Sequence, residues 1–348
     1  MKFIHIADIH LGAKPDRDKE WAKEREMHSW QAFKEVIDKA KEEQVQLLLI
    51  AGDLFHGQPL VKELKEVNYH FSRIPQTQVV LIAGNHDHLT PDSCYRTFQW
   101  EKNVHFLKSE EIDYIELEGL DTRVYGMSYW KKEILEPRYK DIHVKAGDFC
   151  NILLAHGGDE KHIPISGSDF ADNDFDYVAC GHIHKPVQIV QDKVVMAGAL
   201  QPIDCNDLGE HGYFEGEIKN HVCHVKFVPL HYCEYVPLKL KVSPEITQGA
   251  LQEFLENRIR LAPAYQKFKI TLNGYCDREN PLDTEKMKSM DRVVKVVNQC
   301  RADYDFEKLK RQYGQQILGR YIRALEEMPQ NKITEKALYY GVEALMAE

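Results

Sequence analysis

The chain has 348 residues, of which 43% are hydrophobic and 29% are charged, and its formal net charge is −10. This length suits about two domains with a sizeable core, and the apolar runs fall short of the roughly 18 residues that a membrane-spanning helix needs. The first residues enter an apolar run without the features of a signal peptide, so we expect a cytoplasmic protein with no membrane contact.

The negative charge is unevenly distributed along the chain. Residues 1–230 contain 26 basic and 38 acidic residues, whereas residues 231–348 contain 19 and 17. Because lysine and arginine neutralise the phosphates of bound nucleic acid, a broad contact with a polyanion is expected to use the C-terminal part, a partner or bound metals. The eight cysteines form no C-x-x-C pair, so neither a zinc knuckle nor a disulfide framework is indicated.

The N-terminal part is predicted to alternate between strands and helices. Apolar residues from Trp30 to Ala40 recur at helical spacing between two apolar runs, which predicts a βαβ unit. Five runs are predicted to be buried strands: 3–7, 47–51, 79–83, 152–155 and 177–180. Further short β-type runs follow residue 110, at 114–118, 123–128, 187–190, 194–197, 213–218 and 222–228. We therefore expect two packed sheets flanked by helices.

A domain boundary is predicted near residues 229–235, where the charge balance changes. Beyond it, three strands (235–242, 265–272 and 292–297) and a helix (245–259) are predicted to form a small α+β module. Leu309 to Leu325 and Ile333 to Met346, separated by Pro329, predict a pair of amphipathic helices, which either pack on their own domain or dock on another protein. The predicted regions are 1–232, 233–302 and 303–348.

Side chains that bind divalent metals follow each of the five buried runs. The clusters are Asp8-Ile9-His10, Gly52-Asp53, Gly84-Asn85-His86-Asp87, His156-Gly157 and Gly181-His182-Ile183-His184. Because the carboxyl ends of parallel strands open on one crevice, residues distant in the sequence converge there. This order predicts a two-metal centre that cleaves phosphoesters.

The residue types also predict roles within such a centre. Asp53 is the candidate bridge between two cations roughly 3.5 to 4 Å apart, which lower the pKa of bound water from about 15.7 towards about 7. His86 is the candidate acid that protonates the leaving oxygen, and Asp87 is expected to orient its imidazole. For His56, three residues after Asp53 in a loop that borders the site, a functional role and a surface role both remain open.

These motifs resemble those of the calcineurin-like metallophosphoesterases, and within them the SbcD and YhaO types of DNA repair exonuclease, bacterial counterparts of the meiotic recombination nuclease. The resemblance extends over residues 1 to about 215, through the clusters above and segments 175–186 and 198–201. It implies a four-layer αββα sandwich with a small α+β capping module and C-terminal helices. It also implies two metals, usually Mn²⁺, one held by Asp8, His10, Asp53 and His184 and the other by Asp53, Asn85, His156 and His182.

The same resemblance implies further roles and partners. His86 would act on the leaving group, and His56 would position a DNA end or strand. Residues 235–300 would cap DNA, and the terminal helices would dock an SMC-like coiled-coil ATPase of the SbcC kind. Stretches 61–71 and 93–100 match those that form a homodimer in relatives, although packing within one subunit is the alternative for them.

Three functions are compatible with this reading. The leading hypothesis is a Mn²⁺-dependent DNA nuclease, a 3′–5′ exonuclease or single-strand endonuclease in double-strand-break repair. The alternative is a phosphatase or small-molecule phosphodiesterase on the same fold; protein phosphatases of this superfamily usually carry an arginine shortly after the bridging aspartate, and residues 53–57 contain none. A non-catalytic scaffold is disfavoured because scaffolding relatives have lost ligands, whereas this chain keeps all seven.

Overall fold

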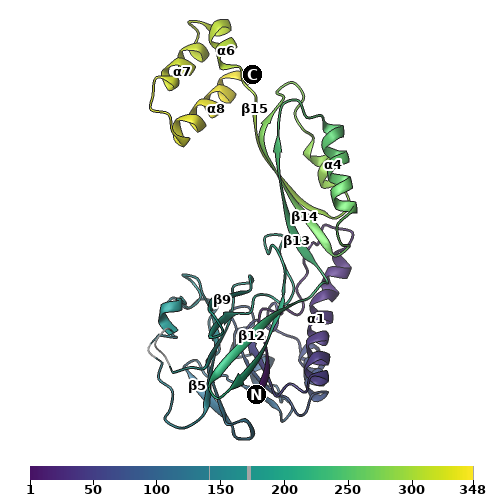
Figure 1. Cartoon of the computed structure of the whole chain (residues 1–348), viewed down its shortest axis with the longest axis vertical. Coiled ribbons are helices and arrows are strands. Elements are labelled where there is room, and N and C mark those ends of the chain that lie inside the picture. The colour runs from purple at the N-terminus through teal and green to yellow at the C-terminus, as the bar shows by residue number, and fades with distance from the viewer. Residues whose placement is uncertain (141, 171–173, 348) are drawn as a thin grey trace. The chain divides into compact units, whose positions relative to one another are not determined.

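The computed structural model describes residues 1–140, 142–170 and 174–347 (Figure 1). Residues 141, 171–173 and 348, which fall in the predicted regions 1–232 and 303–348, lie outside this description. The chain divides into two compact units. The first comprises Met1–Val236 together with Ala264–Lys267, and the second comprises Pro237–Pro263 together with Phe268–Glu348.

The first unit contains two six-stranded sheets within the described residues, and the first of these has the order β12-β11-β1-β2-β3-β4. Strands β1 to β4 run parallel, whereas β11 and β12 are antiparallel additions at one edge. The strands are β1 (Lys2–Ile6), β2 (Leu47–Ala51), β3 (Gln78–Ile82), β4 (Val104–Phe106), β11 (Gly212–Lys219) and β12 (Val222–Pro229). The carboxyl ends of β1, β2 and β3 therefore lie at one edge of this sheet.

The second sheet has the order β5-β6-β7-β8-β10-β9, with β6, β7, β8 and β10 parallel. The strands are β5 (Asp113–Leu117), β6 (Thr122–Gly126), β7 (Cys150–His156), β8 (Tyr177–Gly181), β9 (Val187–Val190) and β10 (Val194–Met196). All five runs that precede the metal-type clusters are thus strands, as predicted, although β7 and β8 belong to a different sheet from β1, β2 and β3.

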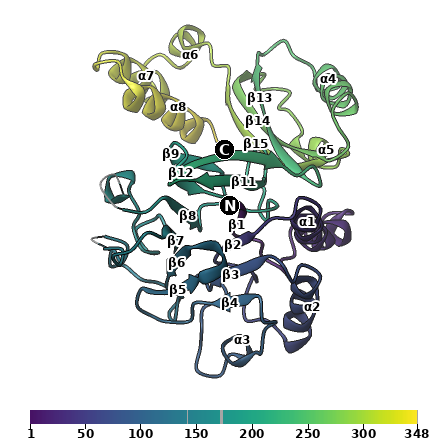
Figure 2. The same ribbon diagram turned by 60° about the horizontal axis from the view of Figure 1, so that its bottom comes forward.

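The two sheets pack face to face through apolar side chains. Helices α1 (Ala22–Glu42) and α2 (Val61–Ser72) and the single turn α3 (Cys94–Thr97) cover the other face of the first sheet (Figure 2). Successive residues of a strand point to opposite faces, so in β2 the side chain of Leu48 packs towards the helices and that of Leu49 packs towards the second sheet. Continuous apolar runs allow both faces to be buried. The predicted α/β sandwich is confirmed.

The outer face of the second sheet differs from the αββα expectation. Leu153 and Val178 pack there against Ile163 and Phe170, which come from loops and the short 3₁₀ helix η2 (Gly167–Phe170). The described residues between β6 and β9 form no α-helix. Glycine and proline at positions 157, 158, 164 and 167 interrupt this part of the chain, and both residues disfavour helix interiors.

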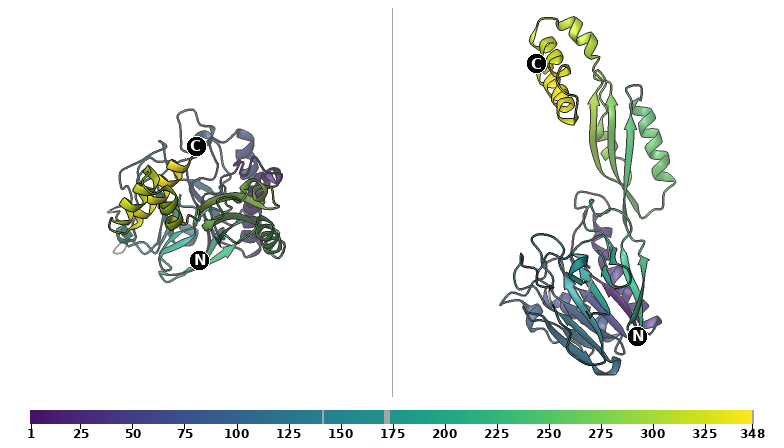
Figure 3. Two further views of the ribbon diagram at one scale, coloured as in Figure 1. Left: turned by 90° about the horizontal axis from the view of Figure 1, so that it is seen from above. Right: turned by 60° about the vertical axis from the view of Figure 1, so that its left-hand side comes forward.

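A three-stranded sheet in the order β13-β14-β15, with β14 and β15 parallel, lies mainly in the second unit; residues 234–236 of β13 and 266–267 of β14 belong to the first. The strands and helices are β13 (Glu234–Val242), α4 (Gln248–Arg260), β14 (Gln266–Cys276), α5 (Thr284–Lys288) and β15 (Val293–Ala302). Figure 3 shows α4 running alongside the sheet, and Leu251, Leu255 and Ile259 on this helix are buried. The predicted strands and helix of the α+β module are therefore present, together with α5, which the sequence pattern did not reveal.

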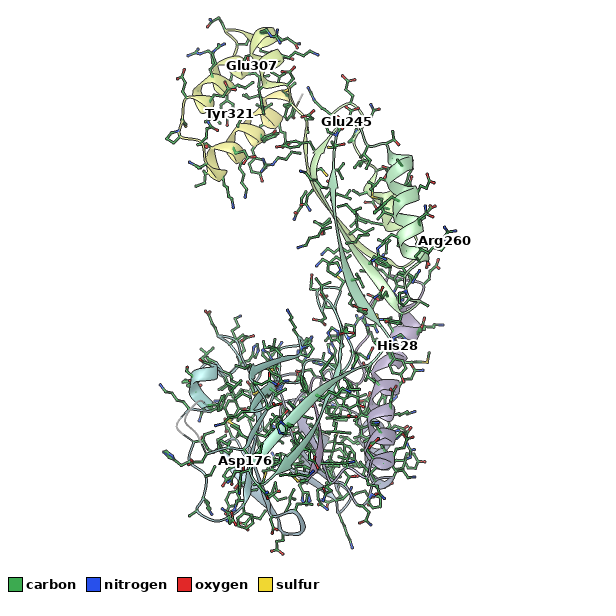
Figure 4. The ribbon with its side chains drawn as sticks, in the orientation of Figure 1. His28, Asp176, Glu245, Arg260, Glu307 and Tyr321 are labelled. Carbon is green, nitrogen blue, oxygen red and sulfur yellow. The ribbon has the colours of Figure 1, made fainter. Side chains whose placement is uncertain are left out.

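The described residues after β15 form three helices where a pair was predicted: α6 (Phe306–Tyr313), α7 (Ile317–Glu326) and α8 (Lys332–Met346). The predicted first helix is divided at Gly314, whose φ of 28° is outside the helical range. Tyr321, labelled in Figure 4, joins α7 to α8 by donating a hydrogen bond to the carbonyl of Ala337 at 2.7 Å. Across the described ranges, no helix has the length and apolar character needed to cross a bilayer.

Candidate metal centre

The seven predicted metal ligands lie at or just beyond the carboxyl ends of five parallel strands. Asp8 and His10 follow β1, Asp53 follows β2, Asn85 follows β3, His156 ends β7, and His182 and His184 follow β8. Because two sheets face each other across the central core, their strand ends bring these side chains together. Asp8, His10, Asp53, Asn85 and His156 are buried.

The backbone at these positions adopts an uncommon conformation. Asp8, His10 and Asp53 have φ values of 49°, 48° and 50°, and His182 has a φ of 96°. A positive φ is unfavourable for residues other than glycine, and such strain is concentrated at functional sites. The turns after β1, β2 and β8 therefore hold a strained backbone conformation, and this conformation directs these side chains into the centre.

The first group of donors consists of Asp8, His10 and His184, each with a ligand atom within 4.8 Å of the others. The Nε2 atoms of His10 and His184 lie 3.1 Å apart. Oδ2 of Asp53 lies 3.8 Å from Nε2 of His10. Two imidazoles and two carboxylates thus converge on one point.

The second group of donors is centred on the side-chain oxygen of Asn85. This Oδ1 atom lies 2.9 Å from Nε2 of His156 and 3.1 Å from Nδ1 of His182. Oδ2 of Asp53 lies 3.6 Å from Nε2 of His156. Because the same oxygen of Asp53 is near His10 in one group and His156 in the other, Asp53 stands between the two groups, where a bridging carboxylate is required.

The residues present fit a pair of divalent cations. Oδ2 of Asp8 accepts the backbone N–H of His182 at 2.8 Å, whereas its Oδ1 is buried without a hydrogen-bond partner among the described residues. A Cβ atom on Gly52 would collide with the His156 ring, and one on Gly84 would collide with the Asp53 carboxylate. Glycine at these two positions therefore allows the donors to approach one another. Mixed imidazole, amide and carboxylate donors suit cations such as Mn²⁺.

Burial dominates the protonation of these donors. It lowers the pKa of His156 to about 3 and that of His182 to about 4, so both imidazoles are neutral, which is the form that binds metal. Burial also raises the pKa of Asp8 to about 7. His184 differs, because its hydrogen bond to Asp207 and the charge of Asp8 outweigh burial and raise its pKa to about 9. A cation that binds His184 must therefore displace a proton.

His86 and His56 lie beside the first donor group. Their rings are stacked, with centroids 5.2 Å apart and planes at 28°, and the His86 ring lies 4.8 Å from that of His10. The backbone N–H of His86 donates to Oδ1 of Asp53 at 2.9 Å, which holds the loop but leaves the imidazole available. Since His56 is exposed and His86 is partly exposed, these two rings form the open side of the centre.

Asp87 has a different position from the one predicted. Its Oδ2 accepts the backbone N–H of Phe55 at 3.1 Å and its Oδ1 accepts that of Gly84 at 2.8 Å. The ring of His86 instead has Nδ1 3.3 Å from the carbonyl of His56. Asp87 is fully buried and ties the loop after β2 to the loop after β3, so it supports the site through the backbone rather than by orienting the imidazole.

Two further carboxylates, which the sequence pattern did not predict, lie next to metal-type histidines. Oδ2 of Asp159 lies 2.9 Å from Nε2 of His182, and Oδ2 of Asp207 lies 3.1 Å from Nδ1 of His184. Asp159 is only three residues from His156, which was a usable signal. Asp207 is 23 residues from its partner, and nothing in the local pattern marks it.

Comparison with known proteins agrees with this geometry. A sequence model of the family described as calcineurin-like phosphoesterase matches residues 1–186, which include all seven donors, His56, His86 and Asp87. The chain is 26% identical over 276 residues to YhaO of Bacillus subtilis (strain 168), described as an uncharacterized metallophosphoesterase; the match covers 74% of this chain and 67% of that protein. The family match extends over more than half of the chain, and the chain therefore belongs to the calcineurin-like phosphoesterase family.

Proposed function

We propose that this metallophosphoesterase is a Mn²⁺-dependent DNA nuclease, acting as a 3′–5′ exonuclease, a single-strand endonuclease or both, in double-strand-break repair. One observation carries the proposal: Asp53 stands between two donor groups, and the stacked pair His56 and His86 lies beside His10 of the first group, on the open side. Family membership supports metal-dependent hydrolysis of phosphoesters. The choice of DNA as substrate is the step that we add.

The chain's own residues divide the work. The cations, when bound, supply an activated water and neutralise the phosphate oxygens. His86 donates a proton to the leaving oxygen, because its backbone N–H binds Asp53 and its ring lies on the open side, 4.8 Å from the ring of His10. The exposed ring of His56 stacks on His86 and offers a flat face to a base or sugar at the end of the strand.

The open side of the site suits a polymer better than a small ester. His56 is exposed, and Arg17 lies close enough for its charge to act on this histidine. A cation beside an open imidazole pair can hold a neighbouring backbone phosphate of the same strand. Leu54 and Phe55, which occupy the positions after the bridging aspartate where protein phosphatases of this superfamily usually carry an arginine, are buried in the core.

The remaining partners belong to the same proposal. The exposed apolar side chains Leu60, Val61 and Tyr69 on and before α2 suit a homodimer interface. Ile317 on α7 and Ile333 and Tyr340 on α8 are also exposed, and they suit docking of an SMC-like coiled-coil ATPase of the SbcC kind. Such a complex would act in the cytoplasm, with the α+β module capping DNA.

The test is a cleavage assay on linear duplex and single-stranded DNA with Mn²⁺, in which Asp53→Asn and His86→Gln are compared with the exposed control His143→Gln. We expect the wild type and the control to degrade DNA, both site variants to lose activity, and excess EDTA to abolish it. Hydrolysis of a small phosphomonoester or phosphodiester without DNA cleavage, even with the ATPase present, would overturn the proposal in favour of a small-ester hydrolase.

A further inference from the structure

The two histidines of the Gly181-His182-Ile183-His184 cluster use opposite ring nitrogens for the centre. His182 turns Nδ1 towards Asn85, whereas His184 turns Nε2 towards His10. In each ring the other nitrogen meets a carboxylate: Nε2 of His182 meets Asp159, and Nδ1 of His184 meets Asp207. Each carboxylate therefore takes the nitrogen that points away from the donor groups.

We propose that Asp159 and Asp207 are positioning residues dedicated to one cation each, Asp159 to the cation of the Asn85 group and Asp207 to the cation of the His10 group. The inference rests on the two-metal chemistry of the proposed function and deepens it. A carboxylate only accepts hydrogen bonds, so the ring nitrogen that faces it must carry the proton. In the neutral ring, the nitrogen that faces the centre then has its lone pair free for a cation, in a fixed orientation.

The two carboxylates are held in place in different ways. Oδ1 of Asp159 accepts the backbone N–H groups of Lys161 and His162 at 2.8 and 2.9 Å, and Oδ2 lies 2.9 Å from Nε2 of His182. Nδ1 of the His162 ring lies 2.9 Å from Oδ1 and 3.0 Å from Oδ2, so it also holds this carboxylate in place. In Asp207 one oxygen makes three contacts. Oδ2 accepts the backbone N–H groups of Ile203 and Asp204 at 3.0 and 3.1 Å and lies 3.1 Å from Nδ1 of His184. Both loops are thus anchored through the carboxylate that orients the ligand.

This difference gives the two aspartate-to-asparagine variants opposite outcomes. In Asp207→Asn the amide oxygen replaces Oδ2 and keeps all three hydrogen bonds, so the tautomer of His184 is preserved. In Asp159→Asn the amide oxygen is needed by two backbone N–H groups, which places the NH₂ group against Nε2 of His182. The proton of His182 then moves to Nδ1, the nitrogen that has to bind the cation, and the lone pair at the centre is lost.

The experiment is a Mn²⁺ titration of the metal-free full-length protein by calorimetry, with electron paramagnetic resonance to separate coupled Mn²⁺ pairs from isolated ions. Because outer carboxylates typically change metal affinity about 10- to 100-fold, we expect Asp159→Asn and Asp207→Ala each to weaken one of two binding events by that factor. We expect Asp207→Asn to recover most of the affinity that Asp207→Ala loses. Asp148→Asn, which removes a fully exposed carboxylate, is the matched control.

Double variants identify the cation that each carboxylate serves. Asp159→Asn should weaken the remaining cation in a His184→Ala background but add nothing to His182→Ala, and Asp207→Ala should show the reverse. Wild-type affinity in both carboxylate variants, or losses that do not follow this pairing, would overturn the inference. Since DNA is absent from these measurements, a protein that binds both cations as described but does not cut DNA would disprove the proposed function alone.

Discussion

Nε2 of His10 and Nε2 of His184 lie 3.1 Å apart, although 174 positions separate the two residues in the sequence. At this distance one nitrogen can donate a hydrogen bond to the other, so only one of the two can carry a proton. A divalent cation lets both lone pairs bind at once, together with the carboxylates of Asp8 and Asp53. Metal binding at this pair should therefore contribute to the stability of the fold.

Addition of Mn²⁺ to the metal-free protein should raise its melting temperature. A ligand that binds only the folded state stabilises it by about 2.7 kcal/mol per site when present at about 100 times its dissociation constant. Thermal unfolding followed by circular dichroism, with Mn²⁺ or with EDTA, measures the effect. The shift should shrink in His10→Ala, which removes one donor of the first group, and equal melting temperatures in both buffers would contradict the prediction.

Substitution of Asp53 should reduce the number of bound cations more than substitution of a donor that belongs to only one group. Oδ2 of Asp53 lies 3.8 Å from His10 and 3.6 Å from His156, so it serves both groups. We expect Asp53→Asn to weaken both cations and His184→Ala to weaken one. Metal content after dialysis, measured by elemental analysis, decides between them; loss of a single cation from Asp53→Asn would show that this residue does not bridge.

His86→Gln should lose catalysis but keep both cations. The backbone N–H of His86 binds Asp53, a contact that any side chain preserves, while its ring lies beside His10 and His56 at the edge of the first group. General acid catalysis contributes about 10² to 10⁴-fold, so kcat should fall by that factor with metal content unchanged. If the variant instead lost a cation, His86 would have to be counted as a ligand.

The sequence predicted the site better than it predicted what surrounds the site. Strand β2 matches its apolar run residue for residue, and strand direction predicts the donors at the carboxyl ends of β1, β3, β7 and β8. The placement of β7 and β8 in a second, facing sheet is what the structure adds. Buried strands carry this signal because both of their faces are apolar. Asp207 had no such signal, since its contact with His184 depends on how the loop after β10 returns to the centre.

Two other differences have local physical causes. The apolar spacing predicts one helix, but the helix breaks at Gly314. The spacing indicates which face of a helix is buried, and it does not show whether the helix is continuous. Asp87 follows His86 in the sequence, yet its carboxylate turns to the backbone of Phe55 and Gly84. Two adjacent residues in a turn need not point to the same side. The structure was therefore needed to show that Asp87 supports the loop and does not orient the ring of His86.

A buried histidine away from the centre should make the fold acid-sensitive. His5 on β1 is fully buried, with Nδ1 2.9 Å from the hydroxyl of Tyr177. Burial lowers its pKa from 6.5 to about 3. Between these two values the unfolded chain binds a proton that the folded chain excludes, so this contribution to stability is complete above pH 6.5 and is lost progressively as the pH falls towards 3.

The loss attributable to His5 between pH 7.5 and pH 5 is roughly 2 kcal/mol, since each pH unit below 6.5 costs about 1.4 kcal/mol. His5→Gln removes the titrating group, so its free energy of unfolding in chelator should fall by about that much less than the wild-type value over the same interval. Denaturant titrations at the two pH values measure the difference. The exposed His143→Gln variant should follow the wild type, and if His5→Gln did so as well, acid sensitivity would have to arise from the other buried imidazoles, among them His156 in the metal centre.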